Sequence, residues 1–311
     1  MEIEARGARP ARARTVLPGA MALAMLIALV VPQPAQAWSN GVDGPNAYGT
    51  HDWVLDKAIK KLRARGSSVG WVKLGVALRA TDDPDTVNGL DHASSPWWHV
   101  YDVWGSSSYG NAPEAARVWF KRAARRLANG NRRGASKALG ILAHIVGDVA
   151  NPLHTDQVPL EDLLHSDYEH DVDTRTERTD TYFRFRYDGR DPSRPGQRVR
   201  SVARKAHKSY TALVNNYNLY GFNSKVRSIT RVSLNRASNA IADLAARIKK
   251  VSRNLSGGGG GAKCHSSYPS VCVPPPPPDL DCGDISHKNF TVVGSDPHGF
   301  DSDGDGVGCE T

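Results

Sequence analysis

Apolar residues recur at helical spacing along most of the chain between residues 52 and 251. In the longest stretch, Val226, Ile229 and Val232 begin an apolar stripe that continues to Ile248. The same spacing predicts helices over residues 52–63, 114–127, 135–149, 160–172, 197–214 and 226–251. Residues 182–187 alternate aromatic residues with arginine, which predicts a short strand or an extended loop. The pattern therefore predicts an all-α, multi-helix domain.

The first 37 residues have the pattern of a secretory signal peptide. Four arginines precede an apolar run from Ala20 to Val31, which is short for a membrane-spanning helix. Ala35-Gln36-Ala37 then forms a small-x-small cleavage site, and cleavage there makes Trp38 the first residue of the mature chain. A retained membrane anchor is the alternative. The pattern predicts a secreted, extracellular protein.

Two low-complexity segments divide the C-terminal part of the chain. Residues 257–261 are all glycine and form a flexible linker, whereas residues 274–278 are all proline and form a stiff spacer. We therefore expect a signal peptide at 1–37, a large domain at 38–255, a linker at 256–278 and a small module at 279–311.

The cysteines lie only in the last 48 residues of the chain. An even number in an exported protein predicts disulfides, of which three connectivities are possible. Pairing nearest neighbours gives Cys264 with Cys272 and Cys282 with Cys309. A zinc site is less favoured because these cysteines lack paired C-x-x-C spacing.

Charge is unevenly distributed along the chain. The formal net charge is +8, of which residues 1–37 carry +2 and residues 279–311 carry −7, which leaves +13 for residues 38–278. A strongly basic domain favours an anionic partner such as a phospholipid surface or nucleic acid. Solubility alone is the equally favoured alternative.

Histidine and carboxylate residues recur through the first half of the large domain. His144 and Asp148 are four residues apart, as are His165 and Glu169, so each pair shares one helix face. His170 points about 100° away from Glu169 on such a helix and is left out. Imidazole and carboxylate suit zinc, and about three protein ligands per catalytic zinc would fill three sites. The candidate metal ligands are Trp38, His51, Asp85, His99, His144, Asp148, His154, His165 and Glu169.

The order and spacing of these residues resemble the bacterial zinc-dependent phospholipase C family. The resemblance covers residues 38–255 and consists of Trp38, Gly49-Thr50-His51, Asp85, Trp98-His99-x-Tyr101-Asp102, His144-x3-Asp148-x5-His154 and His165-x3-Glu169. It implies an all-helical domain whose first residue binds zinc through its amine and carbonyl.

The resemblance also implies how the ligands divide among three zinc ions. One ion would be held by Asp85, His99, His144 and Asp148; a second by Trp38, His51 and Asp148; and a third by His154, His165 and Glu169. Asp148 would bridge two ions. Asp85 would also be the general base that accepts a proton from the attacking water. Asp82 is the alternative to Asp85, since both lie in the same acidic run.

Residues 279–311 resemble the Excalibur calcium-binding domain of bacterial extracellular proteins. Asp301, Asp303 and Asp305 stand at alternate positions before Gly306, like the start of an EF-hand loop. The chain ends before the usual twelfth position, so Glu310 would substitute there. A solvated acidic tail is the alternative. The resemblance implies calcium as a second bound metal.

The leading functional hypothesis is a secreted zinc phospholipase C that hydrolyses the phosphodiester of phospholipid head groups. We expect it to act as a monomer on a phospholipid membrane surface. A zinc-cluster single-strand nuclease is the main enzymatic alternative, because a charge of +13 also suits nucleic acid. A non-catalytic, calcium-dependent surface-binding protein is the third hypothesis.

Overall fold

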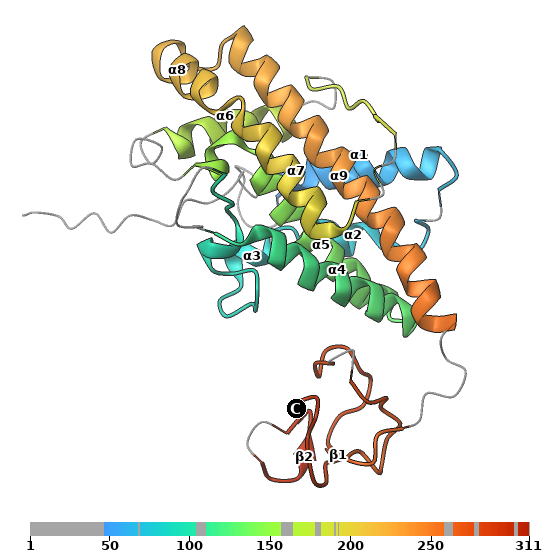
Figure 1. Ribbon diagram of the computed structural model, residues 1–311. Helices are drawn as coiled ribbons and strands as arrows, with labels where there is room; N and C mark the ends of the chain where they lie inside the picture. The colour runs from blue at the N-terminus through green and yellow to red at the C-terminus, as the bar shows by residue number, and fades with distance from the viewer. Residues whose placement is uncertain are drawn as a thin grey trace, which may run out of the picture. The chain divides into compact units, whose positions relative to one another are not determined.

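The computed structural model describes residues 47–67, 69–103, 110–156, 164–177, 182–189, 191, 193–257, 264–276, 280–301 and 304–310. The expected signal peptide, its cleavage site and Trp38 lie outside these residues. Within them the chain is mostly helical, as the apolar spacing predicts, with one small two-stranded sheet near the C-terminus (Figure 1).

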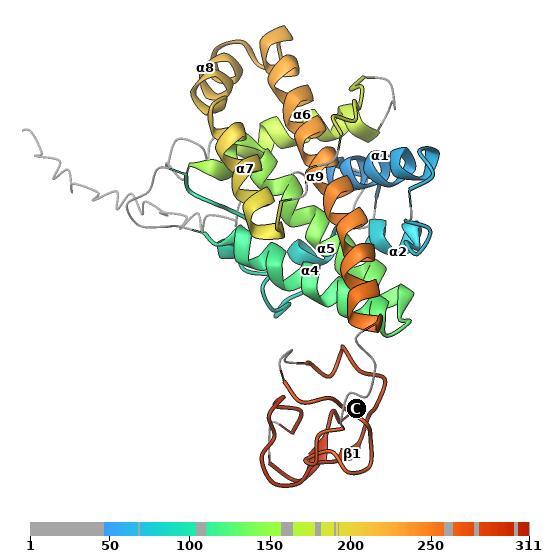
Figure 2. The same cartoon turned by 45° about the vertical axis from the view of Figure 1, so that its right-hand side comes forward.

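The large domain is a bundle of helices around α5 (Arg132–Ala150) (Figures 1 and 2). Fifteen of the 19 residues of α5 are buried, so this helix is covered on nearly every side. The helices around it are α1 (Thr50–Ala64), α2 (Leu74–Arg79), α3 (Asp83–Thr86), α4 (Ala112–Ala128), α6 (His165–Glu177), α7 (Pro195–His207), α8 (Tyr210–Tyr220) and α9 (Ser224–Gly257). Two short 3-10 helices, η1 (Pro96–Trp98) and η2 (Pro152–Thr155), also belong to this domain. Among the described residues, no helix has the length and apolarity to cross a membrane.

Close approach between α2 and α5 depends on a glycine. A Cβ atom at Gly140 would meet the Ala77 carbonyl oxygen at 2.1 Å. Because that oxygen belongs to the backbone, a larger residue at position 140 would push α2 away from α5. The approach matters for the site, since α2 leads directly into Thr81 and the acidic run that follows it.

A second core joins α8 to the elements that follow α5. This core is formed by buried residues of three elements: Leu153 of η2, Tyr168 and Val172 of α6, and Leu213 and Tyr217 of α8. Tyr168 and Tyr217 meet edge to face, with ring centroids 5.4 Å apart. This core fixes η2 and α6 relative to each other.

Two of the predicted helices differ from those observed. The expected helix over 197–214 is interrupted at Lys208 and Ser209, where the Ser209 N–H bonds to the Ala206 carbonyl in a tighter turn. The helix expected over 160–172 begins at His165 and continues to Glu177, and residues 160–163 lie outside those described.

Residues 182–187 form an extended loop, so the strand alternative is wrong. Asn235 of α9 accepts the Arg186 N–H at 2.6 Å and donates to the Arg184 carbonyl at 2.9 Å. Asn239, one turn later, accepts the Asp188 N–H at 3.1 Å and donates to the Arg186 carbonyl at 2.8 Å. Side-chain amides therefore take the place of a neighbouring strand.

The C-terminal module has its own small core. Strands β1 (Phe290–Thr291) and β2 (Val307–Gly308) pair antiparallel. Disulfides join Cys264 to Cys272 and Cys282 to Cys309, which is the nearest-neighbour pairing. Tyr268 and Val273 pack in the same core as Phe290 and Phe300, so part of the segment that the sequence assigns to the linker folds with the module.

Candidate metal centre

Five helices and the residue that follows η1 bring the expected histidines and carboxylates together, apart from Trp38, which lies outside the described residues. His51 comes from the first turn of α1, Asp85 from α3, and His99 from the residue after η1. α5 contributes His144 and Asp148, η2 contributes His154, and α6 contributes His165 and Glu169. Their ligand atoms form three groups: His51 with His144 and Asp148; Asp85 with His99 and His144; and His154 with His165 and Glu169. Within each group these atoms lie within 4.8 Å of one another.

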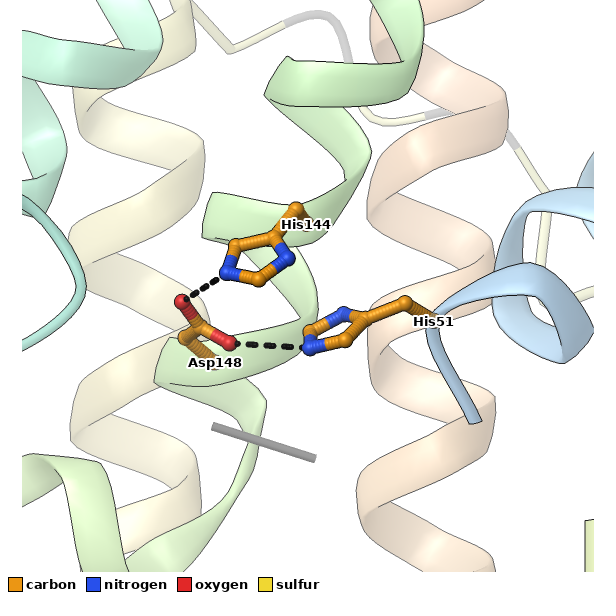
Figure 3. A group of neighbouring side chains, drawn as sticks. All are labelled: His51, His144 and Asp148. Carbon is orange, nitrogen blue, oxygen red and sulfur yellow. Dashed lines mark ion pairs between the residues drawn. The ribbon is translucent and has the colours of Figure 1, made fainter. Parts of the chain in front are cut away.

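Asp148 lies at the centre of the first group (Figure 3). One carboxylate oxygen is 3.3 Å from Nε2 of His51, and the other is 3.2 Å from Nε2 of His144 and 3.0 Å from Nδ1 of His99. The rings of His51 and His144 are stacked, with centroids 4.0 Å apart. Asp148 is fully buried, and neither of its oxygens accepts a hydrogen bond of normal geometry from these nitrogens. A buried carboxylate in that position needs a cation or charged donors.

Gly147 makes the stacking of His51 on His144 possible. A Cβ atom at position 147 would lie 2.7 Å from Nδ1 of His51. The glycine thus lets α1 deliver its first turn against α5 at the level of Asp148. The residues around Gly147 in the sequence do not indicate this contact, because the contact depends on where α1 begins.

The second group distinguishes between the two acidic candidates. Oδ1 of Asp85 is 3.7 Å from Nδ1 of His99 and 3.6 Å from Nε2 of His144. Asp82 instead lines a cavity of about 180 Å³ together with Tyr48 and Asp52. Burial, together with the nearby charge of Asp82, raises the pKa of Asp52 to about 7. The geometry therefore favours Asp85 over Asp82 as a ligand.

The third group lies between η2 and α6. Nε2 of His154 is 3.0 Å from Nε2 of His165, which in turn is 2.8 Å from Oε1 of Glu169. All three residues are buried. The adjacent His170 is exposed, as its position on the helix predicts.

Backbone carbonyls determine which nitrogen of the central imidazoles carries a proton. Nδ1 of His144 is 2.7 Å from the Thr81 carbonyl oxygen. Nε2 of His99 is 2.5 Å from the Ala93 carbonyl oxygen. A carbonyl only accepts hydrogen bonds, so both of these nitrogens are N–H donors. In the neutral rings, the lone pairs are then on Nε2 of His144 and Nδ1 of His99, which face each other at 3.1 Å.

Two lone pairs at that distance repel each other unless a proton or a metal ion lies beside them. His154 repeats the arrangement, since its Nδ1 is 3.3 Å from the His99 carbonyl oxygen and its Nε2 faces His165. Fixing one nitrogen to a carbonyl is how metal-binding imidazoles are commonly oriented. The donor set therefore fits a metal such as zinc, and it fits in each of the three groups.

Charged neighbours outweigh burial in setting the pKa values of this region. Burial alone would lower the pKa of His144, but Asp148 and Asp85 raise it to about 9. Burial opposes ionisation of Asp148 and Glu169, yet the surrounding imidazoles lower the pKa of both carboxyls. Both acids are therefore ionised at neutral pH.

Sequence reasoning did not identify Asn151 as part of the site. Its side chain donates to Oε1 of Glu169 at 2.9 Å and accepts the Leu153 N–H at 3.1 Å. It therefore holds Glu169 and η2 together and orients the carboxylate toward His154 and His165. The sequence offered only Asn151-Pro152 as the end of a helix, which gives no indication of a partner 18 residues away.

In the C-terminal module, Asp301 organises a tight turn. Its carboxylate accepts the N–H groups of Gly304, Asp305 and Gly306 at 2.9, 3.1 and 2.9 Å. Glu310 is exposed at the end of the described chain, and Asp303 lies outside the described residues. One carboxylate therefore holds three consecutive N–H groups of this turn.

The chain is similar to proteins from two genera of bacteria. A phospholipase C from Bacillus cereus is 25% identical over 230 residues, which cover 63% of this chain and 80% of that protein. The structure of alpha toxin from Clostridium absonum aligns with a TM-score of 0.50 and 18% identity over 72% of this chain and 68% of that chain. The alpha-toxin of Clostridium perfringens, from an avian strain, gives a TM-score of 0.49 and 16% identity over the same shares.

No family model matches the chain. The likeness to the Clostridium absonum structure supports the all-α fold. The sequence likeness to the Bacillus protein supports a segment similar to bacterial phospholipase C.

Proposed function

We propose that this protein is a secreted, zinc-dependent phospholipase C that hydrolyses the phosphodiester of phospholipid head groups. The observation that supports it best is the set of three buried imidazole and carboxylate groups gathered around α5, η2 and α6. The sequence similarity to a bacterial phospholipase C points to the same activity. The basic charge of residues 38–278 suits an anionic lipid surface.

The ligand assignment that we propose adapts the three groups: His144 stays with Asp85 and His99, Asp148 is shared, and Trp38, which lies outside the described residues, joins His51. Asp85, His99, His144 and Asp148 would hold one zinc ion; Trp38, His51 and Asp148 a second; and His154, His165 and Glu169 a third. Zinc bound there would stabilise the negative charge of the phosphodiester and lower the pKa of a water molecule. The disulfides of the module accord with export from the cytoplasm.

The residues themselves provide the acid–base part of the reaction. The Asp85 side chain is 7% exposed, whereas that of Asp148 is completely buried. We assign Asp85 as the group that accepts a proton from the attacking water, since it lies at the rim of the group and can reach solvent. Asp148 stays ionised and holds three imidazoles in position.

We also propose that the C-terminal module binds calcium through Asp301, Asp303, Asp305 and Glu310, and that it has the Excalibur fold. The turn around Asp301 supports this assignment. A purely structural role for the large domain, with calcium-dependent surface binding as the only activity, is less favoured because the three metal groups are complete in their ligand types.

A single experiment separates the enzymatic alternatives. Mature, zinc-loaded protein is given phosphatidylcholine, other phospholipids and single-stranded DNA side by side, and released phosphate esters and nucleotides are measured. We expect hydrolysis of phospholipid that a chelator abolishes and zinc restores. Cleavage of DNA without cleavage of phospholipid would replace the proposal with the nuclease alternative, which the basic charge also favours.

A further inference from the structure

The turn between α8 and α9 is closed by hydrogen bonds at the ends of both helices. Gly221 has a φ of 58°, and its N–H bonds to the Tyr217 carbonyl at 2.8 Å. Asn223 then starts α9 by accepting the N–H groups of Lys225 and Val226 at 2.9 and 3.0 Å. Figures 1 and 2 show α8 and the first turns of α9 at one end of the bundle.

The base of this turn is attached to α6, which carries two residues of the metal centre. The guanidinium of Arg175 lies 4.1 Å from the ring centroid of Phe222. The Tyr217 hydroxyl donates to Asp171 at 2.8 Å. The turn is therefore fixed to the helix that holds His165 and Glu169.

Two large side chains at the end of α8, directly before this turn, are exposed to solvent. Leu219 is 67% exposed and Tyr220 is 71% exposed, which makes them the most exposed large hydrophobic residues in the described part of the chain. Exposed apolar residues that are adjacent to each other, beside a turn held to the rest of the domain, are candidates for an interaction surface. A tyrosine, with an apolar ring and a polar hydroxyl, suits the boundary between lipid and water.

The stretch of sequence that contains the turn carries charge of a single sign, although Asp171 of α6 lies at the base of the turn. Residues 192–242 contain ten lysines and arginines and no aspartate or glutamate. One of the ten, Arg198, is buried against Asp243, but Lys208, Lys225 and Arg231 are exposed. The partner that fits this combination is anionic and has an apolar interior.

We propose that the α8–α9 turn docks this protein onto an anionic phospholipid surface, with Leu219 and Tyr220 inserted and the neighbouring lysines and arginines against the head groups. This docking proposal rests on the proposed function, because it names the surface through which the protein would reach a phospholipid substrate. Nucleic acid would use the basic residues but would not require insertion of Leu219. A second copy of this chain would carry the same positive charge and would repel it.

The test measures binding separately from turnover. Full-length mature protein, both zinc-loaded and chelated, is sedimented with vesicles of phosphatidylcholine alone or with a third of phosphatidylglycerol. The variants are Leu219→Ser with Tyr220→Ser, and Lys225→Glu. Their matched controls are Leu255→Ser and Lys250→Glu at the other end of α9, which remove the same kind of exposed group.

We expect wild type to bind the anionic vesicles in both metal states. The affinity of the double variant for these vesicles should fall about tenfold and that of Lys225→Glu about fivefold, while the affinities of the controls should not change. Equal binding of anionic vesicles by the wild type and the double variant would overturn the proposal. It would also be overturned if the double variant lost binding to single-stranded DNA but not to vesicles. A wild-type dimer that the double variant dissociates would overturn it as well. Binding without phospholipid hydrolysis would instead reject the proposed activity and leave the docking surface standing.

Discussion

His144 and His99 face each other through Nε2 and Nδ1 at 3.1 Å, while the other nitrogen of each ring donates a hydrogen bond to a backbone carbonyl. An arrangement of two facing lone pairs is stable only with a shared proton or metal ion. Asp148 lies against both rings and also reaches His51. The metal content of the protein should therefore depend on this carboxylate more than on any other.

Asp148→Asn should remove more than one zinc ion. We expect about three zinc ions in the wild type, from the usual three or four ligands per ion. The amide has no negative charge with which to bridge two ions, so two sites should empty together. Metal analysis by mass spectrometry measures this, with Asp167→Asn, an exposed acid on α6, as the control. One zinc or none in active wild type would contradict the three-site assignment.

Gly147→Ala should weaken metal binding by displacing His51. The added methyl group would lie 2.7 Å from Nδ1 of His51, and overpacking of this kind costs about 1–3 kcal/mol. Gly75→Ala is the matched control, since its Cβ would have only an Arg79 side-chain atom within reach, at 3.9 Å. That change should stabilise α2 by about 0.5–1 kcal/mol. Thermal unfolding with and without zinc measures both effects. If Gly147→Ala keeps full zinc binding, His51 is not a ligand.

The stability gained from zinc should increase between pH 6.5 and pH 9. In the metal-free protein the pKa of His144 rises from 6.5 to about 9, through Asp148 and Asp85 and against burial. The charged His144 therefore stabilises the metal-free fold fully below pH 6.5, and this stability is lost as the pH rises through about 9. Zinc requires the neutral ring, so its affinity increases over the same range.

The measurement is Tm in zinc and in chelator across this range. We expect the two values to diverge by several degrees as the pH rises, with the chelated protein becoming less stable. A chelated protein whose Tm increases from pH 6.5 to pH 9 would show that His144 does not carry this charge.

An extra residue before Trp38 should abolish most of the activity. If the amine of Trp38 binds zinc, it must be free and deprotonated, and a peptide nitrogen cannot replace it at neutral pH. The extended protein should hold one zinc ion fewer than the mature one. Trp38→Ala keeps the amine and carbonyl and should lose less. Full activity with a tag fused directly to Trp38 would remove Trp38 from the metal centre.

Much of the fold could be predicted from residues 52–251, because a buried helix requires apolar residues at fixed intervals. The boundary between α7 and α8 could not, since Lys208 and Ser209 are neither glycine nor proline and both suit a helix interior adequately. The core of the C-terminal module was also missed. Tyr268 and Val273 belong to a segment without periodicity, and packing there depends on two disulfides and on residues distant in sequence.

The candidate site likewise contains some residues that the sequence identifies and others that only the fold identifies. Pairs on one helix, such as His165 and Glu169, are evident from their four-residue spacing. The sequence favours Asp85 and leaves Asp82 as the alternative, and the fold places Asp85 beside His99 and Asp82 beside Asp52. Asn151 has no signature, because its contact with Glu169 joins two separate elements.

Polar side chains along α9 affect which substitutions the neighbouring loop can accept. Asn235, Asn239 and Asp243 are spaced four residues apart along α9 and accept the main-chain N–H groups of Arg186, Asp188 and Asp191, and Asp243 also accepts from the Arg198 side chain. The path of the loop is thus specified by these side chains of the helix and by the buried ring of Phe183, and not by the exposed arginines between them. Arg184 and Arg186 can be exchanged for other residues without altering that path, so the helix serves as a template on which a surface loop can diversify.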